Sequence, residues 1–207
     1  LMFYRKFKRT DSLYVISDPH INHKNLTKGE SSWKDLGPTR DFKTVQEMSQ
    51  SVIDSIWSVP EGSTIFVLGD MFFGEKKYVE DLLLKLSVRY RLVYIMGNHC
   101  TWFRKQTHLH SYFEFVGDYL EIFWEGKLVC MFHYPISVWN EGHKNSWLLC
   151  GHSHGTHAPS LPETKDTGKI LDCGWDLHKR PLSFLEVEAI MQTKKYTPKD
   201  HHNKETT

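Results

Sequence analysis

Short apolar runs and longer amphipathic stretches alternate along the chain, and the two patterns predict different elements. An apolar run of a few residues bounded by turn residues is typical of a buried strand. Such runs occur at Leu13–Ser17, Thr64–Leu68, Arg91–Met96, Trp147–Cys150 and Lys169–Asp172. Residues 112–132 hold two or three further strands, with Glu125 and Gly126 at a hairpin turn.

Three other stretches carry helical signals. Apolar residues recur at helical spacing from Phe42 to Trp57, and residues 76–88 repeat the pattern. Ser183 and Glu186 form a capping box that opens a last helix. Strands that alternate with helices predict an α/β fold. At about 100–200 residues per domain, we expect one domain over residues 1–192 and a flexible polar tail over 193–207.

Short polar clusters rich in Asp, Asn and His follow several of the apolar runs. The clusters are Asp18-x-His20, Gly69-Asp70, Gly97-Asn98-His99, His133 and Gly151-His152-x-His154. In open α/β sheets, ligands bind beyond the carboxyl ends of the strands. The sequence therefore predicts that these polar groups meet at one edge of a sheet. A long polar loop over residues 21–40 is also expected to be functional.

Composition narrows the class of protein. The formal net charge is +1, so no overall field attracts nucleic acid or a membrane. The four cysteines include no C-x-x-C pair, which excludes a zinc ribbon, and we expect reduced thiols in a cytoplasm. No apolar stretch approaches the length of a membrane span. Histidine is the unusual residue, with thirteen copies.

The polar clusters together offer two carboxylates, five imidazoles and one amide. A single zinc ion needs three or four ligands, so this set suffices for two metal ions. Mixed His and Asp ligands suit Mn, Fe, Zn or Ni rather than Mg or Ca. Two divalent ions would give the site affinity for an anionic phosphoryl group although the whole protein is nearly neutral.

The ordered set D-x-H, GD, GNH, H and GH-x-H resembles the calcineurin-like metallophosphoesterases, from about Leu13 to Asp176. Further segments look like the small single-domain branch found in bacteria and phages: His23-Lys24-Asn25, Phe42–Met48, His133-Tyr134-Pro135, Ser137-Val138-Trp139 and Gly174-Trp175-Asp176. The resemblance implies a four-layer α-β-β-α sandwich of two mixed β-sheets flanked by helices. It also implies a cytoplasmic enzyme, in the host cytoplasm if the chain is phage-encoded.

Site roles also follow from the resemblance. Asp18, His20 and His154 would hold a first metal and Asp70 would bridge, while Asn98, His133 and His152 would hold a second metal. Manganese is the expected metal, with Fe, Zn or Ni as alternatives. A metal-bridging hydroxide would attack a phosphomonoester or phosphodiester. Asn98 would contact the phosphate, and His99 would act as the general acid.

Substrate contacts are expected from His23, Asn25, Tyr134 and Trp139, which follow the motif residues. The substrate would be a small phosphorylated molecule such as a nucleotide. One departure from the family concerns the position after GNH, where an acid usually orients the histidine and Cys100 stands here. Asp118, Glu121 and Asp176 are candidates to replace that acid.

Two other functions remain open at this point. A nuclease of the same superfamily would act on nucleic acid, but the net charge of +1 gives little of the usual electrostatic footprint. A non-catalytic interaction module could keep the fold, although such proteins tend to lose the catalytic histidine, and His99 is present. The sequence gives no information on oligomeric state.

Overall fold

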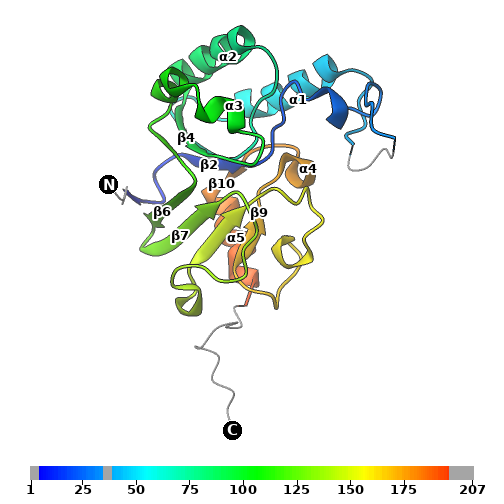
Figure 1. The fold of residues 1–207 in the computed structure, drawn as a ribbon. Coiled ribbons are helices and arrows are strands. Elements are labelled where there is room, and N and C mark those ends of the chain that lie inside the picture. The colour runs from blue at the N-terminus through cyan, green and yellow to red at the C-terminus, as the bar shows by residue number, and fades with distance from the viewer. Residues whose placement is uncertain (1–4, 35–38, 196–207) are drawn as a thin grey trace.

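The computed structural model describes residues 5–34 and 39–195. Two five-stranded β-sheets lie face to face, and each sheet contains both parallel and antiparallel pairs (Figure 1). The general prediction of an α/β fold with two mixed sheets and helices is confirmed.

The first sheet has the strand order β10-β2-β3-β4-β5. Its strands are β2 (Leu13–Ile16), β3 (Thr64–Leu68), β4 (Arg91–Ile95), β5 (Phe115–Gly117) and β10 (Leu182–Ser183). Strands β2 to β5 run parallel, and β10 is antiparallel to β2. The three central strands are almost fully buried, which explains why they read as continuous apolar runs in the sequence.

The second sheet has the strand order β1-β6-β7-β8-β9. Its strands are β1 (Lys6–Phe7), β6 (Tyr119–Trp124), β7 (Lys127–Phe132), β8 (Trp147–Cys150) and β9 (Ile170–Asp172). Strands β6 and β7 form the predicted hairpin around Glu125 and Gly126, both of which have positive φ. Strands β7, β8 and β9 are parallel, so their carboxyl ends lie at the same edge.

The helices cover the sheets unequally. Helices α1 (Val45–Trp57) and α2 (Lys76–Arg89) pack their apolar faces on the outer side of the first sheet, as Figure 1 shows. Helix α5 (Phe184–Thr193) instead contributes Phe184, Val187 and Met191 to the core between the sheets. The outer side of the second sheet packs against Trp139 and Ile136 of the segment after β7. Two short helices, α3 (Thr101–Arg104) and α4 (Trp175–His178), complete the regular structure with the 3-10 turns.

Most predicted elements are present, with shifted ends. The first helix begins at Val45 rather than Phe42, because Thr44 and Glu47 form a capping box there. The predicted capping box of Ser183 and Glu186 is confirmed. The strands β1 and β10 and the helices α3 and α4 were not predicted, since elements of two to four residues carry no period.

The first residues of the expected polar tail, 193–195, have defined hydrogen bonds in the structure. Thr193 still belongs to α5, and the Lys194 side chain is 1% exposed and donates to the carbonyls of Leu161 and Thr164. The rest of that prediction, residues 196–207, lies outside the described residues. The four cysteines are free and buried, as expected for reduced thiols. Within the described ranges, no helix combines the length and the apolar character that a membrane span needs.

Candidate metal centre

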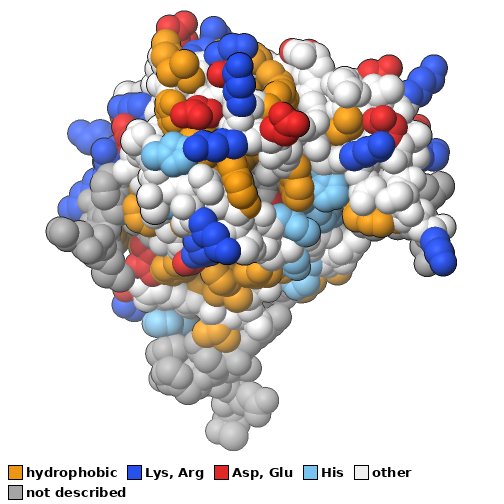
Figure 2. All heavy atoms as spheres, turned by 45° about the horizontal axis from the view of Figure 1, so that its top comes forward, with side chains coloured by type: hydrophobic (Ala, Val, Ile, Leu, Met, Phe, Trp, Pro, Cys, Tyr) orange, Lys and Arg blue, Asp and Glu red, His pale blue; other side chains and the backbone are white. Residues whose placement is uncertain are grey.

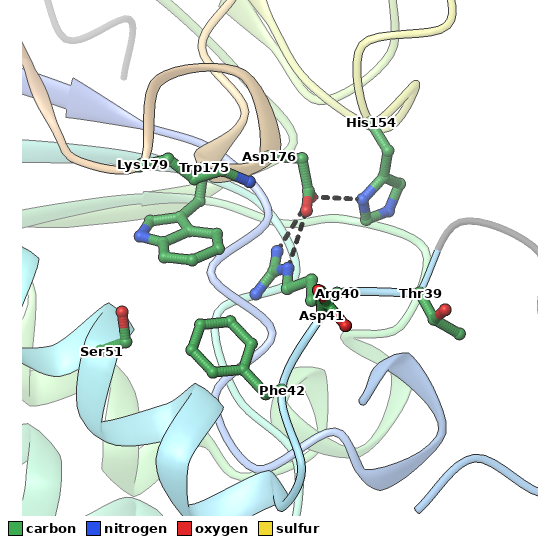
Figure 3. A pocket seen from close by; sticks show the side chains of 9 residues that line it. All are labelled: Thr39, Arg40, Asp41, Phe42, Ser51, His154, Trp175, Asp176 and Lys179. Carbon is green, nitrogen blue, oxygen red and sulfur yellow. Dashed lines mark hydrogen bonds and ion pairs between the residues drawn. The ribbon is translucent and has the colours of Figure 1, made fainter. Parts of the chain in front are cut away.

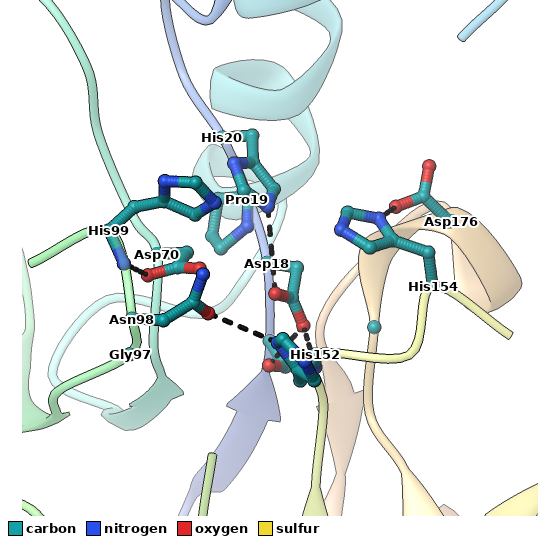
Figure 4. Close-up of polar contacts among 12 residues, drawn as sticks. Asp18, Pro19, His20, Asp70, Gly97, Asn98, His99, His152, His154 and Asp176 are labelled. Carbon is teal, nitrogen blue, oxygen red and sulfur yellow. Dashed lines mark hydrogen bonds and ion pairs between the residues drawn. The ribbon is translucent and has the colours of Figure 1, made fainter. Parts of the chain in front are cut away.

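The polar clusters meet where the two sheets present the carboxyl ends of their parallel strands. Asp18 and His20 follow β2, Asp70 follows β3, and Asn98 and His99 follow β4 (Figure 4). His133 follows β7, and His152 and His154 follow β8 in the other sheet. A bridge between Ser17 and Gly174 joins the two sheets at this point. We use the term metal centre for Asp18, His20, Asp70, Asn98, His133, His152 and His154.

Several residues of the metal centre have a backbone conformation that L-amino acids rarely adopt. The φ angles of five of them lie between +47° and +69°: Asp18, His20, Asp70, His152 and His154. Such conformations cost of order 1–3 kcal/mol each and concentrate at functional sites. The strain bends the chain sharply after each strand, which turns the side chains toward one another.

Two motif glycines are required because other groups approach their backbone closely. A Cβ atom on Gly69 would lie 2.2 Å from Nδ1 of His133. A Cβ atom on Gly151 would lie 1.7 Å from Oγ of Ser17 and 2.3 Å from Oδ2 of Asp18. The glycines of GD and GH-x-H therefore leave room for metal-centre residues from other strands.

A first group of donor atoms comprises Asp18, His20 and His154, whose potential ligand atoms lie within 4.8 Å of one another. His20 Nε2 is 3.6 Å from Asp18 Oδ1. Both atoms are buried, and neither has a hydrogen-bond partner among the described residues. Burial raises the pKa of Asp18, but the His20 contact and the neighbouring imidazoles outweigh it and lower the pKa to about 2. Burial also lowers the pKa of His20, so this imidazole is neutral with an available lone pair.

A second group comprises Asp18, Asp70 and His133. His133 Nδ1 is 2.8 Å from the Leu68 carbonyl, which can only accept, so Nδ1 carries a proton and Nε2 is the atom that is available to a metal. This Nε2 faces Asn98 Oδ1 at 2.9 Å and Asp70 Oδ2 at 3.5 Å. His152 Nδ1 also lies 3.0 Å from Asn98 Oδ1.

These contacts fit bound cations. With the proton of His133 on Nδ1, the atoms Asn98 Oδ1, Asp70 Oδ2 and His133 Nε2 present lone pairs to one another, and a cation among them would stabilise this arrangement. A cation would likewise stabilise the unpartnered Asp18 and His20 atoms in the first group. The mixed nitrogen and oxygen donors suit Mn, Fe, Zn or Ni. Asp18 belongs to both groups, whereas the resemblance implied that Asp70 is the shared carboxylate.

Asp176 and Arg40 support the first group, and sequence reasoning did not assign them there. His154 Nδ1 donates to Asp176 Oδ2 at 2.7 Å, which leaves His154 Nε2 for a metal. Arg40 donates to both oxygens of Asp176, and also to the backbone carbonyls of Asp18 and Pro19. Burial alone would raise the pKa of Asp176 and lower the pKa of His154. The hydrogen bonds and neighbouring charges outweigh burial, so the pKa of Asp176 is held well below its usual range and the pKa of His154 is raised.

The residues proposed to replace the acid after GNH do not reach His99. Asp118 pairs with Arg104, and Glu121 accepts from Tyr119 and Asn140. Asp176 is engaged by His154 and Arg40. That expectation was therefore wrong for all three residues. The backbone N–H of His99 instead donates to Asp70 Oδ1 at 3.0 Å, and the exposed His99 ring packs near Phe73 with centroids 5.4 Å apart.

The expected substrate contacts divide into two pairs. His23 lies beside His20 and His99, with ring centroids 5.4 Å and 6.1 Å away, and burial lowers its pKa to about 4. Tyr134 packs on His133 and His152. The structure does not bring Asn25 and Trp139 into the metal centre.

Asn25 and Trp139 have structural contacts instead. Asn25 Oδ1 accepts from the backbone and the hydroxyl of Ser32, which closes the local loop. Trp139 is 9% exposed, packs in the apolar cluster outside the second sheet, and donates from Nε1 to Ser146. A buried ring of this kind cannot serve as an open substrate surface, which corrects the expectation for Trp139.

A cavity of about 510 Å³ lies behind the wall formed by His154 and Asp176 (Figure 3). Trp175 and Phe42 lie next to each other in its lining, with ring centroids 6.2 Å apart. The Arg40 guanidinium and the Lys179 ammonium lie 4.6 Å and 4.7 Å from the Trp175 ring. The cavity therefore adjoins the metal centre through His154 without containing its other residues.

Comparison with known proteins gives relatives of unknown role. No protein-family model matches the chain. An uncharacterized protein of Methanocaldococcus jannaschii, MJ1445, is 26% identical over 183 residues, which cover 87% of this chain and 91% of the relative. The crystal structure of a protein of unknown function from Aquifex aeolicus, AQ665, superposes with a TM-score of 0.60 at 21% identity, over 87% of this chain and all of that one. The structural match supports the general α/β arrangement.

Proposed function

We propose that the protein is a binuclear metal-dependent phosphoesterase with the calcineurin-like sandwich of two sheets flanked by helices. The observation that supports the proposal is the convergence of Asp, His and Asn acceptor atoms in two adjoining groups, each of which suits a cation. The order of the motifs along the chain supports the family assignment. The buried free thiols suit a reducing cytoplasm, where we place the enzyme.

In this proposal, Asp18, His20 and His154 hold one metal, and Asp70, Asn98, His133 and His152 hold the other. Asp18 and Asp70 both lie close enough to His133 to take part in the second group. Divalent ions of this kind supply Lewis acidity and lower the pKa of a water to near neutrality, which is the chemistry that hydrolysis of a phosphoester needs. The native ions are transition metals, with manganese expected first.

The residues of the chain then have separate tasks. The Asp18 and Asp70 carboxylates and the imidazoles of the metal centre fix the position of positive charge. His99 is exposed at the edge of the metal centre while its backbone is held to Asp70, so its ring is placed to give a proton to the leaving oxygen. Asn98 is also exposed there and orients the phosphoryl group. The substrate is a small phosphoester.

Manganese-dependent release of nitrophenol from bis-p-nitrophenyl phosphate or p-nitrophenyl phosphate tests the proposal. The protein should bind two equivalents of Mn²⁺, and His133→Ala should lose hydrolysis together with one equivalent. His108→Ala is the matched control, because His108 is exposed in the 3-10 turn after α3 and outside the metal centre. A wild-type protein that binds no metal, or full activity of His133→Ala after metal stripping, would refute the proposal.

A further inference from the structure

Three exposed aromatic side chains lie beside histidines of the metal centre or its neighbours His23 and His99. Trp33, Trp102 and Tyr134 are 40%, 39% and 36% exposed, whereas four of the other tryptophans are buried: Trp124, Trp139, Trp147 and Trp175. Single exposed aromatic rings are common on protein surfaces and need no explanation. What requires an explanation is the location of these three rings beside imidazoles.

Each of the three rings is in contact with, or shares a cavity with, an imidazole at the site. Tyr134 lies 4.7 Å from the His152 ring and 4.9 Å from the His133 ring. Trp33 packs edge-on against His23 at 5.9 Å, and His23 in turn lies next to His20. Trp102 lines a cavity of about 120 Å³ together with His99. We call Trp33, Trp102 and Tyr134 the aromatic rim.

The rim residues come from separate segments of the fold. Trp33 is in the loop after β2, Trp102 is in α3 after the GNH turn, and Tyr134 directly follows a metal-centre histidine at the end of β7. Figure 2 shows histidine side chains gathered on one face of the molecule, with hydrophobic side chains beside them. Aromatic surface thus lies beside His23, His99 and His152, which come from three different segments of the fold.

Aromatic rings of this kind recognise flat groups without needing charge. Tryptophan and tyrosine stack on any nucleobase, since every base has a π-face. The net charge of +1 provides no field that would hold a long nucleic acid. A rim with stacking surface on a nearly neutral protein therefore suits a small ligand with one planar heterocycle and one phosphate.

We propose that the aromatic rim binds the base of a nucleoside phosphoester, so that the enzyme prefers nucleotides to phosphoesters of sugars or glycerol. This inference rests on the proposed phosphoesterase function. The base stacks on rim residues while the phosphoryl group lies at the metal centre. The rim residues determine specificity and take no part in the bond cleavage.

The test compares two ligands that differ only in the base. Binding of AMP and of ribose 5-phosphate to the Mn²⁺-loaded protein is measured by titration calorimetry and as competition against bis-p-nitrophenyl phosphate hydrolysis. AMP should bind about 5- to 100-fold more tightly, the range that stacking of one base supplies. Trp33→Ala, Trp102→Ala and Tyr134→Ala should each reduce that preference, measured as the ratio of the AMP and ribose 5-phosphate affinities in Mn²⁺-loaded protein.

Tyr78→Ala is the matched control, because Tyr78 is 38% exposed on α2 and lines a different cavity. Equal affinity for the two ligands in an active protein, or a preference that all three rim variants retain, would overturn the inference. Cleavage of single-stranded oligonucleotides in preference to AMP would replace it with a nuclease. A protein that binds no Mn²⁺ and hydrolyses no ester refutes the underlying function instead, so the two failures are distinguishable.

Discussion

The Cys100 thiol lies 3.6 Å from Asp70 Oδ1, beneath the turn that carries Asn98 and His99. The Met71 N–H donates to the Tyr94 hydroxyl, which lies 2.9 Å from Cys100 Sγ, and either of these two groups can be the donor. The Gly97 N–H also donates to the sulfur. When the Tyr94 O–H donates to the sulfur, the Cys100 S–H donates to Asp70 Oδ1. Burial raises the pKa of Cys100, which keeps the thiol protonated for this role. The residue after GNH thus positions a carboxylate rather than the histidine.

Cys100→Ala should weaken one of the two metal equivalents, because Asp70 Oδ1 loses a donor and the carboxylate gains freedom to rotate. One hydrogen bond corresponds to about a two- to tenfold change in affinity. Cys100→Ser keeps a donor at the same position and should retain most of the affinity. Mn²⁺ titration calorimetry on the two variants checks this. If the Ser and Ala variants have the same Mn²⁺ affinity, the Cys100 side chain contributes only packing.

Asp176→Asn should weaken metal binding in the first group while it preserves the shape of the side chain. The negative charge on Asp176 favours the His154 tautomer that exposes Nε2 and raises the basicity of that atom. Loss of such a partner typically lowers metal affinity about 10- to 100-fold, and we expect a loss of this size here. The measurement is Mn²⁺ affinity in protein shown to be folded by circular dichroism.

Asp118→Asn is the control for this substitution. Asp118 also pairs with an arginine, but that pair is exposed and neither of its residues belongs to the metal centre. It should leave both metal equivalents unchanged, since exposed ion pairs contribute little. Equal effects of the two substitutions would show that Asp176 has no particular role at His154.

The sequence predicted those site residues that lie in short consecutive motifs. Motifs such as Gly97-Asn98-His99 follow strands with a clear apolar pattern, so their convergence at one edge was predictable. The supporting residues were not, because their contacts span the chain. Arg40 and Asp176 are 136 positions apart, and Asp176 and His154 are 22 apart. No local pattern indicates which acid pairs with which imidazole.

Trp139 and Tyr134 illustrate the same limit for aromatic residues. Both follow His133 closely, and no sequence pattern distinguishes them. The chain turns after β7 so that Tyr134 stays beside the imidazoles, while Trp139 folds back onto the outer side of the second sheet. The direction of a side chain in an irregular segment depends on tertiary packing that periodicity does not record.

Gly151→Ala should abolish the metal centre or the fold. The added methyl group would lie 1.7 Å from Ser17 Oγ and 2.3 Å from Asp18 Oδ2, both buried, so β2 and β8 would have to separate. Gly126→Ala is the comparison, since a Cβ there meets nothing within 4 Å although φ is +73°. That variant should lose only about 1–2 kcal/mol from backbone strain. Urea unfolding and Mn²⁺ content measure both, and a similar small loss in the two variants would contradict the close approach.

The capping box of α5 predicts a specific pH dependence of stability. Hydrogen bonds from the Arg180 guanidinium lower the pKa of Glu186 to about 2 from its ordinary value of 4.5. A carboxyl whose pKa is depressed on folding contributes stability that is fully present above 4.5 and is lost as the pH falls from 4.5 toward 2. Glu186→Gln removes this contribution. The difference in free energy of unfolding between wild type and variant should therefore be constant near neutrality and shrink as the pH falls below about 4.5.

Glu47→Gln provides the control for that measurement, because Glu47 caps α1 through the backbone N–H groups of Lys43 and Thr44. No Arg or Lys side chain pairs with Glu47 in the part of the chain that the structure describes. Its substitution should give a smaller difference from wild type at neutral pH, since the helix-cap contribution alone is removed. Urea titrations between pH 7 and pH 3.5 measure the free energy of unfolding of the wild type and of each variant. A Glu186→Gln difference that stays constant down to pH 3.5 would show that the Arg180 contact does not stabilise the folded state.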